Sequence, residues 1–502
     1  MKTRTGIFNY ISKKYNVVSL YLAVLFLILT FIFIPHYIEL SDVVESWFFA
    51  KGLLFYKDFV AYHFPLGKLI LLPIHYLTAL DLRADPFLGL AIGILTTVFL
   101  YKIGILVKNK ISIPLSLFFF SIYYWLTATG VQYYHEQLIA LLLTITIYCY
   151  LRIKLHKHLG IKNLFIIGLL ISLTELAGQV VSLTLIVFFI LVVYSLFVEK
   201  KSLQTFILNI LSFLAGCLVP FLLLALYFFL KGGLEDFIFS NITYYFIQYS
   251  DYGNRPILQL PLYLLAFYLP IFGGLLLFIN KKFRNNPDRH IFLFLFFLSL
   301  STLPFVLFSV FHPHHITYAL PILSMFAGIV FIDLRKYSPS MKLITKLLSL
   351  LLVSIFILGF VKDVIPWYKN KIKYPATLDV ANDLFPGGDG MYNTVEWIKN
   401  NTPPAAKILV IGDSLFYLKS NRMPAIKTCK GMEYVWRDLN SIKKEIYATP
   451  PAYWIIGMPY LEKLEKVYLQ KEVVVFVNRY LKNNYKLVHE TGVWQIWKKS
   501  TD

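Results

Sequence analysis

Long apolar segments recur along the first two thirds of this chain. A helix needs about 20 apolar residues to cross the hydrocarbon core of a bilayer, and most of these segments have that length. The expected spans are Val17–Pro35, Pro86–Val107, Ile111–Thr129, Gln137–Ile153, Leu164–Ala177, Val180–Val198, Leu203–Leu230, Leu258–Asn280, Ile291–Phe311, Ile316–Ile332 and Leu343–Val361. The pattern predicts an all-α polytopic membrane domain over residues 1–365, with about eleven transmembrane helices.

The composition excludes a soluble globular protein. Of 502 residues, 58% are hydrophobic and 15% charged, whereas soluble proteins carry about 25% charged residues. The net charge of +20 would suit a nucleic-acid partner, but the lysines and arginines form short runs between the apolar segments. Such a distribution orients a membrane protein, so no nucleic-acid partner is expected. The three cysteines are too few and too scattered for a disulfide framework.

The basic runs predict the orientation. They are Lys2–Lys14, Lys102–Lys110, Arg152–Lys162, Lys200–Lys201, Lys281–Arg289 and Arg335–Lys342. Basic residues concentrate in cytoplasmic loops, so the N-terminus is expected inside the cell. The polar stretch Met1–Asn16 precedes an apolar run without a small-residue cleavage site, so no cleavable signal peptide is expected. With an odd number of spans, the chain is expected to be a multi-pass plasma-membrane protein with an extracytoplasmic C-terminal domain.

Two external loops are long, and acidic residues gather on their side of the membrane. The first covers residues 36–85 and the second residues 231–256. Within the first loop, Asp42–Leu53 has helical periodicity, and Leu66–Leu80 is apolar but too short to span. Both are expected to be helices along the membrane surface or re-entering it. Long structured loops on one side usually carry function.

The tail, residues 366–502, has the pattern of a small α/β domain. Helices are expected at Tyr392–Asn400, directly after Asp413-Ser414, and over Leu461–Asn483; strands are expected at Lys407–Gly412, Tyr453–Gly457, Lys486–His489 and Val493–Trp497. The single strand-Gly-Asp-Ser turn lacks the glycine spacing and the lysine of a phosphate loop. A nucleotide site is therefore not expected there.

Several motifs together resemble the GT-C superfamily of membrane glycosyltransferases. In the first loop, Asp42–Phe59 places an acid after the first span, then an aromatic helical turn and a glycine, and Tyr62–Gly67 continues with His-x-Pro-Leu. Tyr134–Gln137 brings a second acid to the outer end of the span Gln137–Ile153, and His314–Pro321 leads into a late helix. Leu409–Pro424 is similar to the extracytoplasmic domain of bacterial members. The branch most resembled includes bacterial protein O-mannosyltransferases and the aminoarabinose transferase of lipid A.

The resemblance implies an inverting transfer of a sugar from a polyprenyl-phosphate donor to an extracytoplasmic lipid, glycan or protein acceptor. In that reaction one carboxylate takes the acceptor proton, and cations or hydrogen-bond donors stabilise the departing phosphate. The resemblance implies Asp42 as the base and Glu136 as a second carboxylate that places the acceptor or a cation. No metal ligands are assigned, since three histidines within His312–His315 cannot all face one point, and a divalent cation is an alternative that is not favoured.

A wider set of external residues is expected to bind substrate: Asp58, His63, Lys68, Arg255, His314 and His315. Structural alternatives remain open for the acids. Asp42 also fits a helix N-cap, with Glu45 completing a capping box, and Glu136 would complement a helix dipole. For the whole chain, the alternative function is a transporter or flippase of lipid-linked sugars. Such proteins usually show internal repeats, which this sequence lacks.

Overall fold

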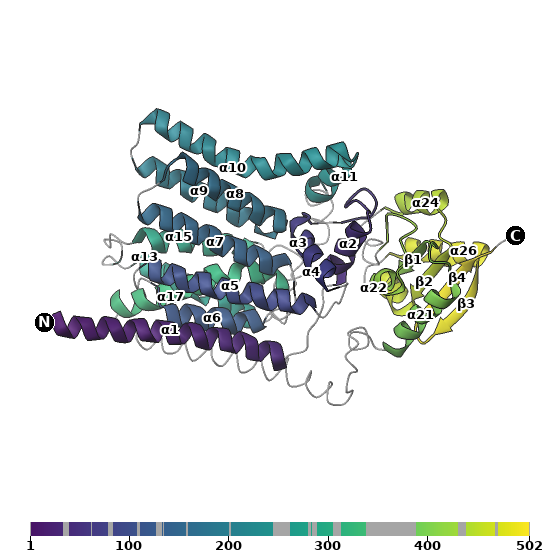
Figure 1. Ribbon diagram of the computed structural model, residues 1–502, viewed down its shortest axis with the longest axis horizontal. Coiled ribbons are helices and arrows are strands. Elements are labelled where there is room, and N and C mark those ends of the chain that lie inside the picture. Colours follow the sequence, from purple (N-terminus) through teal and green to yellow (C-terminus); the bar gives the residue numbers. More distant parts are fainter. Residues whose placement is uncertain are drawn as a thin grey trace.

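The structure, a computed structural model, has two parts: a bundle of apolar helices and a small sheet domain at one end of it (Figure 1). The described residues are 2–33, 40–61, 63–78, 84–107, 111–126, 133, 135–156, 159–199, 202–243, 262–279, 283, 289–304, 313–337, 388–429, 438–466 and 470–500. The N-terminus lies at the end of the bundle opposite the sheet domain (Figure 1). This arrangement fits an odd number of spans.

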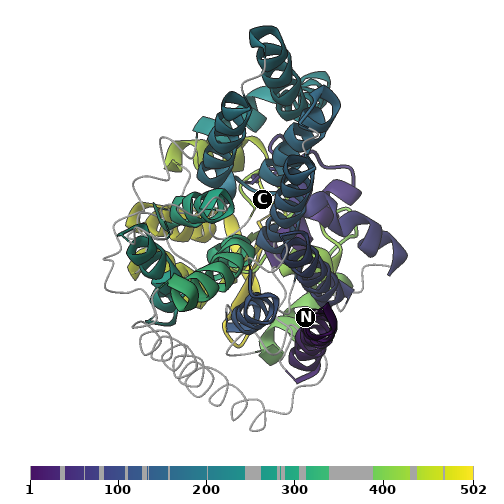
Figure 2. The ribbon, with the colours of Figure 1, turned by 90° about the vertical axis from the view of Figure 1, so that its left-hand side faces the viewer.

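The bundle helices lie side by side along the long axis of the molecule, and Figure 2 shows them end on. They are α1 (Lys2–Phe33), α5 (Asp85–Leu106), α6 (Ile113–Leu126), α7 (His135–Leu155), α8 (Ile161–Ala177), α9 (Ser182–Val198), α10 (Leu203–Leu230), α13 (Leu262–Ile279), α15 (Arg289–Ser301) and α17 (Leu320–Tyr337). Within the described part of the chain, six helices are long and apolar enough to cross a membrane, and four apolar helices are shorter. The expected span Leu343–Val361 lies outside the described residues, so a total of eleven stays a prediction.

Several helix ends differ from the expected ones. Helix α1 begins at Lys2 rather than Val17, because the basic residues before the apolar run continue the same helix. Helix α17 begins at Leu320 rather than Ile316, after a 3₁₀ helix over Pro313–Ala319. The second residue of α17 is Pro321, and proline fits well in the first turn of a helix, where its missing N–H has no intrahelical partner.

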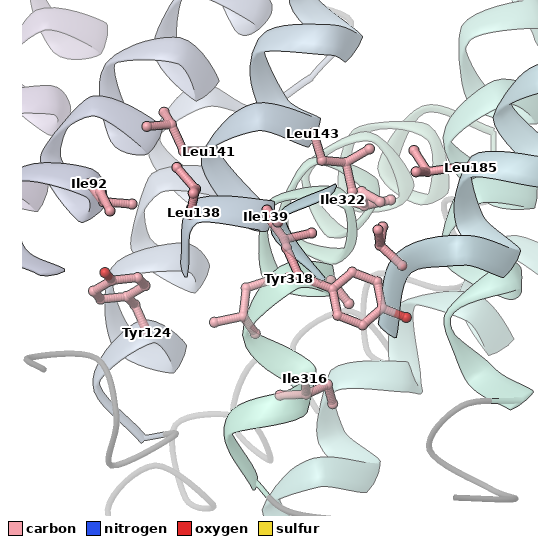
Figure 3. Packing of buried hydrophobic residues seen from close by; sticks show 14 of the residues in the cluster. Ile92, Tyr124, Leu138, Ile139, Leu141, Leu143, Leu185, Ile316, Tyr318 and Ile322 are labelled. Carbon is pink, nitrogen blue, oxygen red and sulfur yellow. The ribbon is translucent and has the colours of Figure 1, made fainter. Parts of the chain in front are cut away.

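Close packing holds the bundle together. In Figure 3, Ile139 of α7 lies near Tyr318 and Ile322, and all three side chains are buried. Helices α8 and α10 approach closely where Gly168 lies. A Cβ atom at that position would be only 2.2 Å from the Phe213 carbonyl oxygen, so there is no room for a side chain. Small residues at such crossings allow backbones to touch, which is a main source of helix association in lipid.

The two long loops that the sequence predicts to be external form short helices at the end of the bundle nearest the sheet domain (Figure 1). The first loop contains α2 (Leu40–Ala50), α3 (Leu66–Leu69) and α4 (Leu71–Leu77), which confirms the two helical stretches expected there. The second contains α11 (Leu234–Ile238) and a π-helical turn over Phe239–Thr243. Helix α2 is buried between the bundle and the sheet domain, where the Phe48 ring meets the Tyr417 ring at 5.5 Å.

The sheet domain has the expected α/β composition. Its elements are α21 (Gly388–Asn401), β1 (Ile408–Ile411), α22 (Leu415–Ser420), α24 (Leu439–Ala448), β2 (Tyr453–Gly457), α25 (Met458–Lys466), α26 (Lys471–Asn484), β3 (Tyr485–Thr491) and β4 (Trp494–Lys499). The strand order is β1-β2-β4-β3, with β1 and β2 parallel and the other pairs antiparallel. The expected boundary at residue 366 lies outside the described residues.

Two details of this domain were not expected. The single helix predicted over Leu461–Asn483 is wrong: α25 and α26 are separate helices, since Gln470 has a non-helical ψ of 48°. Helix α24 has no counterpart in the prediction. Asp438 caps it by accepting hydrogen bonds from the backbone N–H groups of Asn440 and Ser441.

Candidate functional site

Helix α2 presents three polar side chains on one buried face. Asp42, Glu45 and Ser46 are spaced three and four residues apart, which places them on the same side of a helix. Their exposed fractions are 2%, 3% and 0%. Each needs a polar partner, because burying a charge or hydroxyl without one costs several kcal/mol. The three partners come from different elements, so α2 is held from several directions.

Asp42 is partnered by His135, the first residue of α7. The His135 Nδ1 atom lies 3.1 Å from Asp42 Oδ2, and the His135 Nε2 atom lies 3.5 Å from Glu136 Oε1. One imidazole therefore lies between the two carboxylates that the resemblance assigns to the reaction. Glu136 is 1% exposed. The fold thus brings Asp42 and Glu136 together, although 93 residues separate Asp42 from His135.

The electrostatic environment keeps Asp42 ionised. Burial alone would raise the pKa of Asp42, but the adjacent His135, with Lys68 nearby, outweighs burial and holds the pKa well below its usual range. His63 is different. Its ring lies 4.6 Å from the His135 ring, and burial together with His135 and Lys68 lowers the pKa of His63 well below its usual value. At neutral pH the site therefore holds a carboxylate at Asp42 and a neutral imidazole at His63.

Two glycines make room for the His135 imidazole. A Cβ atom on Gly67 of α3 would lie 2.5 Å from His135 Cβ. A Cβ atom on Gly178, after α8, would lie 2.8 Å from His135 Cδ2. Both distances are shorter than any stable carbon–carbon contact, so any other residue would displace the histidine. Tyr133 adds a further link by donating a hydrogen bond from its hydroxyl group to the Gly67 carbonyl oxygen.

A second ion pair lies one turn further along α2. Lys68, expected from the sequence to bind substrate, forms a buried pair with Glu45, and the two side chains are 2% and 4% exposed. Buried charges persist in proteins only when they are paired. The pair joins α2 to α3 beside Asp42. In this state the ammonium group of Lys68 is already neutralised by a carboxylate.

A chain of side-chain hydrogen bonds links the first loop to the second. His63 Nδ1 lies 3.3 Å from Gln179 Oε1, and the Gln179 amide donates to Asn241 Oδ1 at 2.9 Å. Tyr56 fixes the loop on the other side, because its hydroxyl donates to the His63 carbonyl oxygen at 2.6 Å. His63, an expected substrate-binding residue, is thus placed directly beside the carboxylate site.

The third polar residue of α2, Ser46, belongs to another buried network. Ser46 Oγ lies 3.0 Å from His75 Nδ1, and His75 Nε2 lies 3.3 Å from Asp85 Oδ1. The order serine-histidine-aspartate resembles a hydrolase triad, but Ser46 is fully buried and also donates to the Val43 carbonyl oxygen. A nucleophile must reach its substrate. The network instead anchors α2 to α4 and α5.

The remaining expected site residues lie elsewhere or outside the description. Asp58 is exposed, and its carboxylate accepts a hydrogen bond from the Leu54 N–H at 2.7 Å, which closes the turn after α2. Arg255 lies outside the described residues. The backbone of His314 and His315 forms part of a 3₁₀ helix, but their side chains are not among those that the structure describes. Their proposed contacts with substrate stay predictions.

His135 is the residue that the sequence did not point to. It stood beside Glu136 in the quoted motif, but no role was assigned to it. The available signal was its position: a titratable side chain in the first turn of a span, next to an acid, is expensive to bury without a function. No group of three histidine, cysteine or acidic side chains suited to a metal ion occurs among the residues with described placement.

The sheet domain covers this end of the bundle. The Lys427 carbonyl oxygen accepts a hydrogen bond from the Val60 N–H at 3.2 Å. The Lys427 ammonium group forms an ion pair with Asp236 of α11. A single residue of the tail thus contacts both long loops, three residues before His63 and five before Asn241.

Comparisons with known proteins show the fold. ArnT from Cupriavidus metallidurans, in its crystal structure bound to undecaprenyl phosphate, aligns with a TM-score of 0.55 at 12% identity, covering 98% of this chain and 97% of ArnT. The oligosaccharyltransferase AglB from Archaeoglobus fulgidus, in complex with an inhibitory peptide and a dolichol-phosphate, aligns with a TM-score of 0.54 at 11% identity, covering 97% of this chain and 74% of AglB. No protein-family model and no curated protein sequence matches the chain. The chain has the GT-C fold, as the first-loop motifs predicted.

Proposed function

We propose that this chain, with its GT-C fold and its buried carboxylate site, is an integral membrane glycosyltransferase. It moves a sugar from a polyprenyl-phosphate donor to a hydroxyl group of a lipid, glycan or protein acceptor. The observation that carries the proposal is the Asp42 carboxylate, which is 2% exposed and lies 3.1 Å from His135 Nδ1, at the end of the bundle nearest the sheet domain (Figure 1). The adjacent His135 holds the pKa of Asp42 well below its usual range, as a base at neutral pH requires. The two solved structures with this fold were bound to undecaprenyl phosphate or dolichol-phosphate, which supports the same donor class here.

The reaction follows from these groups. The acceptor oxygen attacks the anomeric carbon while the bond from that carbon to the phosphate oxygen breaks, and its electron pair leaves with the phosphate. Asp42 takes the acceptor proton. A single displacement of this kind inverts the anomeric configuration. Because the site is buried, each charge interaction in it is stronger than in water.

The leaving phosphate needs cationic or hydrogen-bonding partners. Lys68 lies beside the site, and exchanging Glu45 for a phosphate oxygen would bring its charge to the donor. His63 would offer a neutral hydrogen-bonding imidazole at the same place. Arg255, His314 and His315 complete the proposed binding set. Glu136 would position the acceptor or a cation.

The proposed orientation places the site outside the cytoplasm. Arg152 and Lys154 lie at the far end of α7 from Glu136, and Arg289 begins α15. Such residues mark the cytoplasmic side. The sheet domain and the site then face the extracytoplasmic space, where the sugar of a lipid-linked donor meets a cell-envelope acceptor.

The test uses membranes that contain the parent protein, Asp42→Asn or Asp438→Asn. Radiolabelled polyprenyl-phosphate sugars are supplied, and transfer of label to acceptor fractions is measured. We expect transfer by the parent and by Asp438→Asn, and a loss of at least about 100-fold in Asp42→Asn. Asp438→Asn is a matched control, since it makes the same change at the exposed N-cap of α24, and asparagine can also cap a helix.

Equal transfer by the parent and Asp42→Asn, at equal expression, would remove Asp42 as the base. If no variant transfers label from any donor, but the parent moves labelled lipid between leaflets, the chain is a flippase and the proposal is wrong.

A further inference from the structure

The contacts of the His135 imidazole with the two carboxylates determine which of its nitrogens carry protons. An ionised carboxylate only accepts hydrogen bonds, so the 3.1 Å contact with Asp42 requires a proton on His135 Nδ1. The other nitrogen lies 3.5 Å from Glu136 Oε1. Two lone pairs facing one another at that distance would repel, so a second proton belongs either to Nε2 or to Glu136. With ionised Glu136 the ring is an imidazolium cation.

Asp42 needs an adjacent cation to stay ionised, because its surroundings are buried. Among the described residues, the titratable groups that face Asp42, or lie next to those that do, are Glu45, His63, Lys68, Asp85, Tyr133, His135 and Glu136. Lys68 is paired with Glu45, and the Asp42 carboxylate is 3% exposed. In such a position an isolated carboxyl group takes up a proton rather than bear a buried charge. A protonated Asp42 could not serve as a base.

We propose that His135 is a positioning residue that holds Asp42 in its ionised form and in its orientation, as a built-in cation between Asp42 and Glu136. The proposal rests on the proposed function of Asp42 as the base, and it adds a role for a residue that need not touch substrate. The glycines on either side support it, since Gly67 and Gly178 leave space for the ring from α3 and from the end of α8. The ring is thus set by packing as well as by charge.

The first measurement is the pH dependence of sugar transfer by the parent and by His135→Gln. Glutamine keeps a hydrogen-bond donor near Asp42 but removes the positive charge. We expect the acid limb of kcat/KM to move upward by at least about one pH unit in the variant, because a buried carboxyl without a cation titrates higher. His75→Gln is the matched control: His75 is also buried and also pairs with an aspartate, but it contacts Ser46 rather than Asp42. Its acid limb should not move.

A second measurement does not depend on activity. Infrared difference spectra of the purified protein, taken between pH 7.5 and pH 5.5, report the protonated carboxyl stretch. We expect His135→Gln to gain such a band over this range and His135→Gln/Asp42→Asn to lose it.

The outcomes separate the two proposals. A band that moves as expected, in a protein that transfers no sugar from any donor, would leave the role of His135 standing and refute the proposed function. An acid limb and a carboxyl band that both stay unchanged in a folded His135→Gln variant would overturn the role of His135, whatever the activity.

Discussion

The buried Glu45–Lys68 pair allows structural and functional roles of a charged residue to be separated. Lys68→Met removes the ammonium group but fills much of its volume. Both side chains of the pair are at most 4% exposed, so Glu45 would lose its cationic partner while its carboxylate stays buried. Breaking a buried pair in this way typically costs about 3–5 kcal/mol, most of it from the stranded partner. The variant should therefore be much less stable than the parent.

The double variant Glu45→Leu/Lys68→Met has no charge to strand. Replacing both members of a buried pair with apolar residues is often neutral or stabilising. We therefore expect the double variant to regain most of the stability lost in Lys68→Met. If Lys68 contacts the donor phosphate, the same double variant should still be inactive. Recovery of stability without recovery of transfer is thus the expected combination.

The assay is heating in detergent followed by size-exclusion detection of the folded monodisperse fraction. At about 2 °C per kcal/mol, the value for larger domains, Lys68→Met should lower the apparent midpoint by about 6–10 °C. A matched control is Lys399→Met, since Lys399 forms an exposed pair with Glu396 and should shift the midpoint by less than about 2 °C. An equal, small shift for both single variants would refute the reasoning, because it would mean that water reaches the Glu45 carboxylate.

Three further predictions concern the same end of the molecule. Gly178→Ala should reduce transfer by about 10- to 100-fold at normal expression, because its Cβ would lie 2.8 Å from the His135 ring. The control Gly160→Ala, whose Cβ would have nothing within 4 Å, should leave transfer unchanged. Equal activities of the two variants would contradict the role of Gly178 in making room for His135. Lys427→Asp should lower the stability of the protein, and the double variant Lys427→Asp/Asp236→Lys should restore it. The coupling energy between the two changes should be below about 1 kcal/mol and should decrease at high salt. Purely additive effects of the two changes on stability would refute the ion pair. The depressed pKa of His63 stabilises the fold above its unfolded value of about 6.5, so stability should fall by up to about 1.4 kcal/mol per pH unit below that value. His63→Gln should show a shallower fall, and an unchanged slope would mean that the ring is not buried in its neutral form.

The acidic α2 face shows that one sequence pattern can fit two interpretations. The N-cap interpretation of Asp42 is wrong, because α2 begins at Leu40 and Asp42 is its third residue. The spacing of Asp42 and Glu45 fits a capping box, and the same spacing directs both carboxylates to one side of a helix. In the structure each carboxylate has a basic partner from a distant segment, Asp42 with His135 and Glu45 with Lys68. Because both pairs are buried, α2 has one position relative to α3 and α7. The reactive group is thus fixed by neighbouring helices rather than by its own loop.

The sequence by itself determined the membrane character, most helix positions and the two long external loops. These depend on local properties: apolar length, the distribution of basic residues and turn signals. Helix α10, for example, has the bounds Leu203–Leu230 that apolar length alone predicted. Local pattern was also sufficient for the strands of the tail, where alternation and buried runs are short-range signals. It was insufficient at Gln470, where one backbone conformation separates two helices that read as one.

Only the tertiary structure decided how the site is built. Asp42, His63, Lys68 and His135 come from four segments, and their partnerships depend on which helix ends meet at one end of the bundle. His135 carried no strong local signal, because its role arises from the two carboxylates that packing brings to its ring. Asp58 carried a stronger local signal, yet it lies exposed and closes a turn. The physical reason is that burial and charge pairing are properties of the assembled neighbourhood: they exist only once distant segments exclude water from the same small volume.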